Sequence, residues 1–205
     1  MRQEIKDFVA ICVDAFTFPE PIYEFGSLQV SDQVGFADLR PLFPGKEFVG
    51  ADMQEGPGVD VVLDLHAIDL PSESVGAILS LDTLEHVEYP RKAMAEMRRV
   101  LKPGGLCVIS SHMLFPIHSY PNDYWRFTPE GFKSLLGVFP ITFVEYGGHQ
   151  LIPHTVLGIG FLRESMADNE WNSFKDQFIQ WKKTWGKQEN LVIKGGKANL
   201  GGNPD

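Results

Sequence analysis

The sequence predicts an α/β fold, with a doubly wound, mostly parallel sheet of seven strands and helices on both of its faces. Two observations carry this prediction. Short apolar segments alternate with helical or loop segments, and few tight hairpin turns join them. In addition, residues 84–111 place a helix, a glycine turn and a buried strand in one uninterrupted run, which is typical of an open α/β sheet.

The predicted strands are short and apolar, and several are rich in β-branched residues. In chain order they cover residues 21–27, 46–52, 59–63, 75–81, 106–110, 141–146 and 155–161. The last two are joined by a short loop with Gly, His, Gln and Pro, so we expect a terminal antiparallel pair, with an antiparallel last strand, on an otherwise parallel sheet.

Helices are expected between these strands. Pro90 suits a first helical turn, and apolar residues then recur at three- and four-residue spacing as far as Leu101. The Lys-Pro-Gly-Gly run at 102–105 should end this helix, because proline cannot continue it and glycine tolerates a left-handed cap. A short helix is predicted after Thr128, which can act as its N-cap, and an amphipathic helix over residues 1–18.

An aromatic-faced helix is predicted over residues 168–186. Its rings recur at mainly three- and four-residue steps, at Trp171, Phe174, Phe178, Trp181 and Trp185. We expect this helix to dock on the domain, with a dimer contact or a substrate lid as the alternative. The length favours a single domain over residues 1–186, followed by a loose tail at 187–205 that has little apolar content.

Composition excludes several classes of function. The 205 residues are 43% hydrophobic and 22% charged, with no apolar run long enough to cross a bilayer and no secretory signal pattern, so we expect a cytoplasmic protein. The net charge of −9 disfavours a nucleic-acid partner. Cys12 and Cys107 are expected to be reduced thiols, and no spacing of cysteines or histidines predicts a metal site.

Polar residues and glycine stand where the first three predicted strands end. In open α/β sheets, ligands bind outside the carboxyl ends of the strands, near the point where strand order reverses. An acid closing the second strand, here Asp52, can accept hydrogen bonds from both hydroxyls of a ribose, and a glycine turn after the first lets a ligand approach the backbone. The set predicts a nucleoside pocket and comprises Glu24, Gly26, Ser27, Asp52, Asp64, Leu65 and His66.

Most of the chain, from about residue 22 to 161, resembles class I S-adenosylmethionine-dependent methyltransferases of the type 11 kind, which have a Rossmann-like sheet. The resembling segments are YEFGS at 23–27, FVGADMQEGPGVDVVLDLH at 48–66, LDTLEHV at 81–87, EMRRVLKPGG at 96–105 and HSYPNDYWRFTPEGF at 118–132. The last of these resembles a bacterial subgroup of methyltransferases, often without a known acceptor.

The resemblance implies S-adenosylmethionine as the cofactor. It implies that Glu24 and Gly26 line the methionine end and that Asp52 binds the ribose. It further implies that the segment Asp64, Leu65 and His66 contacts adenine. Ser27, Met53 and Leu81 are assigned to the same cofactor site.

One departure from the family pattern concerns the glycine-rich turn. The usual form is E-x-G-x-G-x-G, whereas this chain has Leu28 and Val30 at the two later glycine positions. Bulky side chains there would crowd a nucleoside if the loop kept its usual path. We therefore expect the loop to be rebuilt over residues 27–36.

Candidate catalytic residues follow the fourth and fifth strands. Asp82 stands where an acceptor would meet the methyl group, and His86 lies on the next turn, although capping and packing would also explain Glu85 and His86. The polar and aromatic loop at 112–126 adds Tyr124 and His118, the latter as a base or acceptor-orienting group.

This loop at 112–126 also has a structural interpretation, in which its aromatic residues plug the sheet end while Asp123 pairs with Arg126. His149 and His154 could face the same opening.

Three functions are compatible with these patterns. The first is methyl transfer from S-adenosylmethionine to oxygen or nitrogen of a small-molecule acceptor, which is a metabolite or a sugar-like compound. For this function we expect no nucleic-acid or membrane partner, and the protein could form a homodimer. The second is an inactive, methyltransferase-like binding or scaffold protein with a filled or collapsed cleft. The third, a dinucleotide oxidoreductase, is disfavoured because G-x-G-x-x-G is absent after the first strand.

Overall fold

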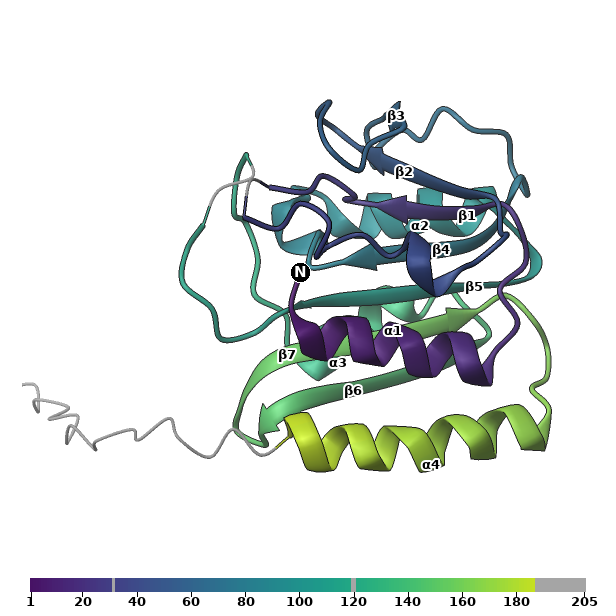
Figure 1. Ribbon diagram of the computed structural model, residues 1–205, viewed down its shortest axis with the longest axis vertical. Helices are drawn as coiled ribbons and strands as arrows, with labels where there is room; N and C mark the ends of the chain where they lie inside the picture. Colours follow the sequence, from purple (N-terminus) through teal and green to yellow (C-terminus); the bar gives the residue numbers. More distant parts are fainter. Residues whose placement is uncertain (31, 119–120, 187–205) are drawn as a thin grey trace, which may run out of the picture.

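The computed structural model describes residues 1–30, 32–118 and 121–186 (Figure 1). The tail predicted over residues 187–205 lies outside the described residues. Among the helices of the described part, none has the length and apolar character needed to span a bilayer.

The strands form one seven-stranded sheet in the order β3-β2-β1-β4-β5-β7-β6. β7 is antiparallel to both of its neighbours, β5 and β6, whereas the other pairings are parallel. The predicted mostly parallel sheet with an antiparallel last strand is therefore confirmed. The strands are β1 (Ile22–Phe25), β2 (Phe48–Asp52), β3 (Val61–Val62), β4 (Val75–Leu81), β5 (Leu101–His112), β6 (Ile141–His149) and β7 (Ile152–Phe161).

Helices cover both faces of the sheet (Figure 1). On one face, α1 (Gln3–Ala15) and α4 (Asp168–Trp185) share a core with Leu79 of β4 and Val108 of β5. On the other, α2 (Pro90–Val100) and α3 (Pro129–Leu136) share a second core with Ile78 and Cys107, which immediately precede Leu79 and Val108 in those strands. The alternation of neighbouring residues between two cores follows from the period-two geometry of a strand.

The aromatic helix α4 docks within the chain. Phe174, Phe178 and Trp181 are buried, and their rings contact Phe8 of α1 with centroid distances of 6.0 to 6.3 Å. The indole N–H of Trp181 donates to the backbone carbonyl of Glu4 at 2.8 Å. This packing accounts for the aromatic spacing without a dimer contact or a lid.

Several boundaries differ from the sequence prediction, among them those around β5 and β3. The central helix ends at Val100, so Leu101 begins β5 and the Lys-Pro-Gly-Gly run belongs to that strand, not to a helix cap. Gly104 does have a positive φ of +84°, but it lies within β5 where the pairing register with β4 shifts, and its backbone N–H donates to the carbonyl of Leu162 at 2.7 Å. The third strand shrinks to Val61–Val62, because only two of its residues pair with β2 at the sheet edge.

The connection from β1 to β2 also departs from a regular α/β unit. Within its described residues it contains a 3-10 turn, η1 (Arg40–Leu42), and no α-helix. Leu39 and Phe43, which flank the turn, are buried in the α1 face of the core. This arrangement leaves a long loop at the carboxyl edge of β1, β2 and β4, and the strand order reverses between β1 and β4.

Candidate functional site

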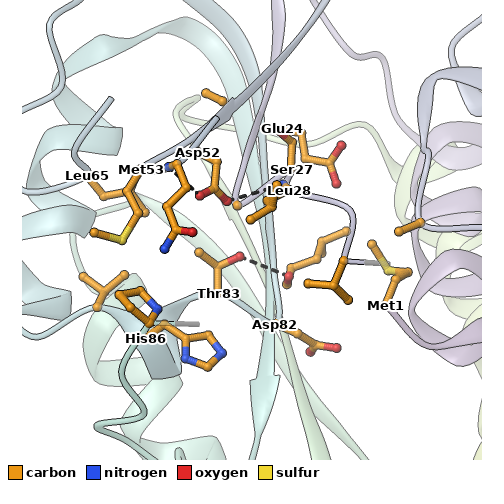
Figure 2. Close-up of a pocket in the computed structure, with 18 of the residues that line it drawn as sticks. Met1, Glu24, Ser27, Leu28, Asp52, Met53, Leu65, Asp82, Thr83 and His86 are labelled. Carbon is orange, nitrogen blue, oxygen red and sulfur yellow. Dashed lines mark hydrogen bonds between the residues drawn. The ribbon is translucent and has the colours of Figure 1, made fainter. Parts of the chain in front are cut away.

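A cavity of about 590 Å³ opens at the carboxyl edge of the sheet (Figure 2). Residues that were predicted for the cofactor and the acceptor meet there, although they come from five separate segments of the chain. Figure 2 places Glu24, Ser27 and Asp52 toward one end and Asp82 and His86 toward the other. Every residue assigned from the sequence to the cofactor or to catalysis lines the cavity: Glu24, Gly26, Ser27, Asp52, Met53, Asp64, Leu65, His66, Leu81, Asp82, His86, His118 and Tyr124.

Gly26 forms the turn that ends β1. Its φ of +90° is a left-handed conformation that disfavours other residues, and a Cβ on it would lie 2.1 Å from Oγ1 of Thr83. The Thr83 hydroxyl in turn contacts the carbonyls of Phe25 at 3.2 Å and Leu81 at 3.1 Å. The turn after β1 is thus clasped to the turn after β4, and glycine is required on both conformational and steric grounds.

Asp52 closes β2, as predicted. One carboxylate oxygen, Oδ1, accepts from the backbone N–H of Gln54 at 3.0 Å, and Oδ2 accepts from the N–H of Leu28 at 3.3 Å. These bonds hold the carboxylate at the wall of the cavity. Since a carboxylate can accept about four hydrogen bonds, this one retains capacity for further donors from a ligand.

Leu28 and Val30 line the cavity without filling it. The Leu28 side chain turns toward the loop after β2, where its Cδ1 lies 2.4 Å from the Cβ position of Gly56. The loop has a path of its own, because Gln29 donates its backbone N–H to the carbonyl of Pro57 at 2.8 Å. The collapsed cleft expected of a scaffold protein is therefore not found.

Glu24 is a buried carboxyl at the end of β1, with 5% of its surface exposed. Burial raises its pKa to about 8, although the nearby Arg40 guanidinium opposes that shift. The group therefore carries a proton more readily than an ordinary glutamic acid and can exchange it near neutral pH. A cationic ligand group beside it would favour its ionised form.

Two of the predicted cofactor residues direct their polar atoms elsewhere. The Ser27 hydroxyl lies beside Gly50, and its Oγ is 2.8 Å from the position that a Cβ on Gly50 would occupy. Both ring nitrogens of His66 are engaged, one with Asp64 at 2.7 Å and the other with the backbone N–H of Tyr89 at 3.1 Å. The hydrogen bond from the His66 backbone lowers the pKa of Asp64. His66 therefore stiffens this wall of the cavity.

Asp82 follows β4 in a left-handed conformation, with φ of +48°, which is unusual for a residue other than glycine. Its carboxylate accepts from the Ser110 hydroxyl at 2.8 Å and pairs with the guanidinium of Arg2 at 3.2 Å. Burial alone would raise the pKa of Asp82, but the charges of Arg2 and His112 and the hydrogen bonds hold it at about 2. This carboxylate stays ionised and anchors Arg2 against the cavity.

Glu85 is fully buried behind the cavity wall in η2 (Leu84–His86). One of its oxygens accepts from the Ser111 hydroxyl at 2.6 Å, and the other lies 3.3 Å from Nε2 of His112. Burial, assisted by the charge of Asp82, raises the pKa of Glu85 to about 8, whereas burial lowers that of His112 to about 4. Helix capping does not explain Glu85, because its side chain contacts β5 and not the start of α2.

The loop after β5 has both of the roles considered from the sequence, because it packs against the end of the sheet and also lines the cavity. Asp123 and Arg126 pair at 2.7 Å, and hydrogen bonds from that guanidinium hold the pKa of Asp123 well below its usual range. The Trp125 indole donates to the carbonyl of Val87 at 3.0 Å, which fastens the loop onto η2. His118 and Tyr124 nevertheless line the cavity. The ion pair is thus the support of a cavity wall.

His86 faces His118 across that wall, with ring centroids 4.7 Å apart. Nδ1 of His86 lies 2.6 Å from the carbonyl of Asn122, and burial lowers the pKa of His86. Nδ1 of His118 lies 3.2 Å from Asp123. The two imidazoles are therefore oriented by the same loop.

Some site residues could not be found from the sequence. Arg2 lines the cavity from the segment before α1, and its ion pair with Asp82 joins positions 80 residues apart. His149 and His154, which could have faced the same opening according to the sequence, do not line the cavity. His154 instead lies 3.0 Å from Glu4 of α1.

Comparison with known proteins agrees with this geometry. Residues 44–109 match the family model described as a methyltransferase domain. An uncharacterized methyltransferase of Mycobacterium ulcerans is 36% identical over 86 residues, which is 42% of this chain and 34% of that protein. A second, from Mycobacterium marinum, is 35% identical over the same length. The match thus spans about a third of the length of these relatives.

Solved structures share the fold at low sequence identity. A SAM-dependent methyltransferase from Archaeoglobus fulgidus superposes with a TM-score of 0.61 at 15% identity, covering 78% of this chain and 94% of that one. The 1,6-didemethyltoxoflavin-N1-methyltransferase of Burkholderia thailandensis, with bound 1,6-didemethyltoxoflavin and S-adenosylhomocysteine, gives 0.56 at 16% identity, covering 77% and 78%. The chain has the class I methyltransferase fold, and residues 44–109 relate it to the methyltransferase domain family.

Proposed function

We propose that this member of the class I methyltransferase fold transfers a methyl group from S-adenosylmethionine to oxygen or nitrogen of a small-molecule acceptor. The observation that carries the proposal is the open cavity at the carboxyl edge of β1, β2 and β4, with the Asp52 carboxylate held at its wall. Its volume of about 590 Å³ lies within the range of ligand pockets in enzymes.

The residues at the Asp52 end are suited to the donor. Asp52 would accept the ribose hydroxyls with its remaining lone pairs, and Leu65 with Met53 would provide apolar contact for adenine. Glu24 would face the methionine end, where an ammonium group would compensate a buried carboxylate. The turn at Gly26 lets a ligand approach the backbone without a side chain between them.

The opposite end of the cavity is suited to the acceptor. S-adenosylmethionine, when bound, supplies an electrophilic methyl group for in-line displacement. The chain must then hold the acceptor in line and shield the reaction from water. We assign that role to His118, His86 and Tyr124, with Asp82 holding Arg2 at the same wall. The mixture of imidazole, phenol and guanidinium groups fits a polar metabolite or a sugar-like compound, and the net charge of −9 disfavours a nucleic acid.

The first test of the proposal is donor binding by Asp52→Asn. This variant keeps one acceptor oxygen but loses the negative charge, together with one of the two hydrogen bonds from the backbone N–H groups of Leu28 and Gln54, so charge-assisted hydrogen bonds to the ribose should weaken. We expect affinity for S-adenosylmethionine and S-adenosylhomocysteine to fall about 5- to 150-fold, corresponding to roughly 1 to 3 kcal/mol. Isothermal titration calorimetry measures it directly.

Asp69→Asn is the matched control, because Asp69 is exposed and does not line the cavity. Its donor affinity should equal that of the wild type. If the wild type gives neither heat nor thermal stabilisation with either ligand, the donor site is refuted.

The second test concerns turnover. Cell extracts incubated with the protein and S-adenosylmethionine should yield a compound that gains the mass of one methyl group, and the gain should disappear when the donor is omitted. A protein that binds the donor yet modifies nothing in extracts from several sources would favour the scaffold function instead.

A further inference from the structure

Three side chains that can bind metals converge behind the acceptor end of the cavity. Glu85 of η2, His112 at the end of β5 and His118 of the following loop each offer one ligand atom, and these atoms lie within 4.8 Å of one another. They belong to three different segments, so the fold alone brings them together. His112 and His118 also line the cavity, which leaves one side of the cluster accessible to a ligand.

Two buried polar atoms in this cluster have no hydrogen-bond partner among the described residues. They are Oε1 of Glu85 and Nδ1 of His112, on side chains that are 0% and 4% exposed. Nε2 of His112 lies 3.3 Å from Oε1 of Glu85 but does not meet hydrogen-bond geometry. A buried polar atom without a partner is energetically costly, so such atoms usually have a partner that is a solvent molecule, an ion or a ligand.

Among the three carboxyl groups near the cluster, those of Asp82, Asp123 and Glu85, the first two have a guanidinium partner. Asp82 pairs with Arg2 at 3.2 Å, and Asp123 pairs with Arg126 at 2.7 Å. In the described part of the chain, no lysine or arginine forms an ion pair with Glu85. Of these three carboxyl groups, Glu85 is therefore the one for which a bound metal ion would be the cationic partner.

We propose that Glu85, His112 and His118 bind one divalent first-row transition ion at the acceptor end of the cavity. Two imidazoles and one carboxylate suit Zn²⁺ or a related ion, whereas Mg²⁺ and Ca²⁺ prefer sets composed of oxygen ligands. Ligand bonds of about 2.0 to 2.2 Å require the atoms to close to roughly 3 to 4 Å, which small side-chain movements achieve. The ion would give the Glu85 oxygen its missing partner.

Three protein ligands leave coordination positions open toward the cavity, as in catalytic metal sites. An acceptor oxygen could occupy such a position and be held facing the donor end. That role rests on the proposed function, whereas metal binding does not, because the cluster contains no residue assigned to the donor.

Metal binding is tested on the whole chain, without a histidine tag and after treatment with a chelator. After Zn²⁺ has been added and the excess free metal removed by dialysis, we expect mass spectrometry to find one Zn²⁺ per chain. When Co²⁺ replaces Zn²⁺, we expect the d–d absorption of low-coordinate Co²⁺. Glu85→Gln keeps the shape and the contact with Ser111 but loses the charge, and His118→Ala removes an imidazole. Each should weaken Zn²⁺ binding at least about tenfold in a competition titration.

His149→Ala is the control, because His149 is an exposed histidine that does not line the cavity. It should bind Zn²⁺ as the wild type does. The proposal is overturned if the wild type retains no metal, or if Glu85→Gln and His118→Ala, shown by circular dichroism to be folded, bind as well as the control. Either result leaves donor binding untouched, so the two proposals fail independently.

Discussion

At the scale of single residues, the pKa values of two buried carboxyl groups on this edge of the sheet are shifted in opposite directions. Asp82 has a pKa of about 2 because Arg2, His112 and Ser110 stabilise its charge despite burial. Glu24 has a pKa of about 8 because burial outweighs the more distant Arg40. Residue type therefore does not determine charge at this site. The partner supplied by the fold determines it.

The Glu24 shift predicts a pH dependence of stability. The folded chain binds a proton at Glu24 up to about pH 8, whereas the unfolded chain releases it near the ordinary value of 4.5. The free energy of unfolding should therefore fall as pH rises between these values, by at most about 1.4 kcal/mol per pH unit from this group. Glu24→Gln removes the titration and should gain stability over the wild type as pH increases.

Urea denaturation at pH 5, 6.5 and 8 measures the difference between variant and wild type. Glu55→Gln, at an exposed glutamate, serves as the control and should show no trend with pH. A constant difference between Glu24→Gln and the wild type across this range would contradict the prediction.

At the scale of elements, the site depends on how the turns after β1 and β4 meet. Gly26 and Thr83 are in close contact, and the Thr83 hydroxyl binds carbonyls from both strands. This clasp positions the glycine turn beside Asp52, whose carboxylate holds the next part of the loop through Leu28. The donor end is therefore built from backbone contacts between elements.

The clasp predicts that Gly26→Ala is more damaging than an ordinary substitution at positive φ. The new Cβ would lie 2.1 Å from Oγ1 of Thr83, so β1 and β4 must separate locally. We expect a loss of stability of roughly 2 to 4 kcal/mol, with weaker donor binding. Thermal denaturation and calorimetry would measure both.

Gly45→Ala isolates the conformational part of that cost. Gly45 also has a positive φ, +74°, but nothing lies within 4 Å of its Cβ position. It should lose only about 1 to 2 kcal/mol and keep donor affinity. Equal losses in the two variants would show that contact with Thr83 contributes nothing.

At the scale of the whole molecule, α4 and α1 form a support for one wall of the cavity. Phe178 and Trp181 of α4 pack on Phe8 of α1, and the segment before α1 carries Arg2 to Asp82. The two helices lie on one face of the sheet (Figure 1). The aromatic face of α4 is therefore occupied within the chain.

Phe178→Ala should expose the role of this packing. Its ring is 6% exposed and lies 5.1 Å from that of Phe143 and 6.0 Å from that of Phe8, so truncation leaves a cavity in the core. We expect the free energy of unfolding to fall by about 3 to 5 kcal/mol. Ile179→Ala, at a neighbouring residue that is 51% exposed, should change it by less than about 0.5 kcal/mol. Similar effects of both substitutions on chemical denaturation would mean that α4 is not docked as described.

Taken alone, the sequence determined the architecture and the rim of the site. Strand period, helical spacing and turn residues are local properties, so they predicted the parallel sheet, the last antiparallel strand and residues such as Asp52 at strand ends. The exact end of α2 escaped it, because Leu101 continues an apolar pattern that suits either a helix or a buried strand.

Only the tertiary structure decided what these residues meet. Arg2 reaches Asp82 across 80 positions, and Glu85 meets His112 and His118 because η2, β5 and the loop pack together. It also decided that the cavity stays open despite Leu28, whose side chain turns toward Gly56. Contacts, burial and hence proton affinity depend on which distant segments the sheet order brings together, and no local pattern encodes that.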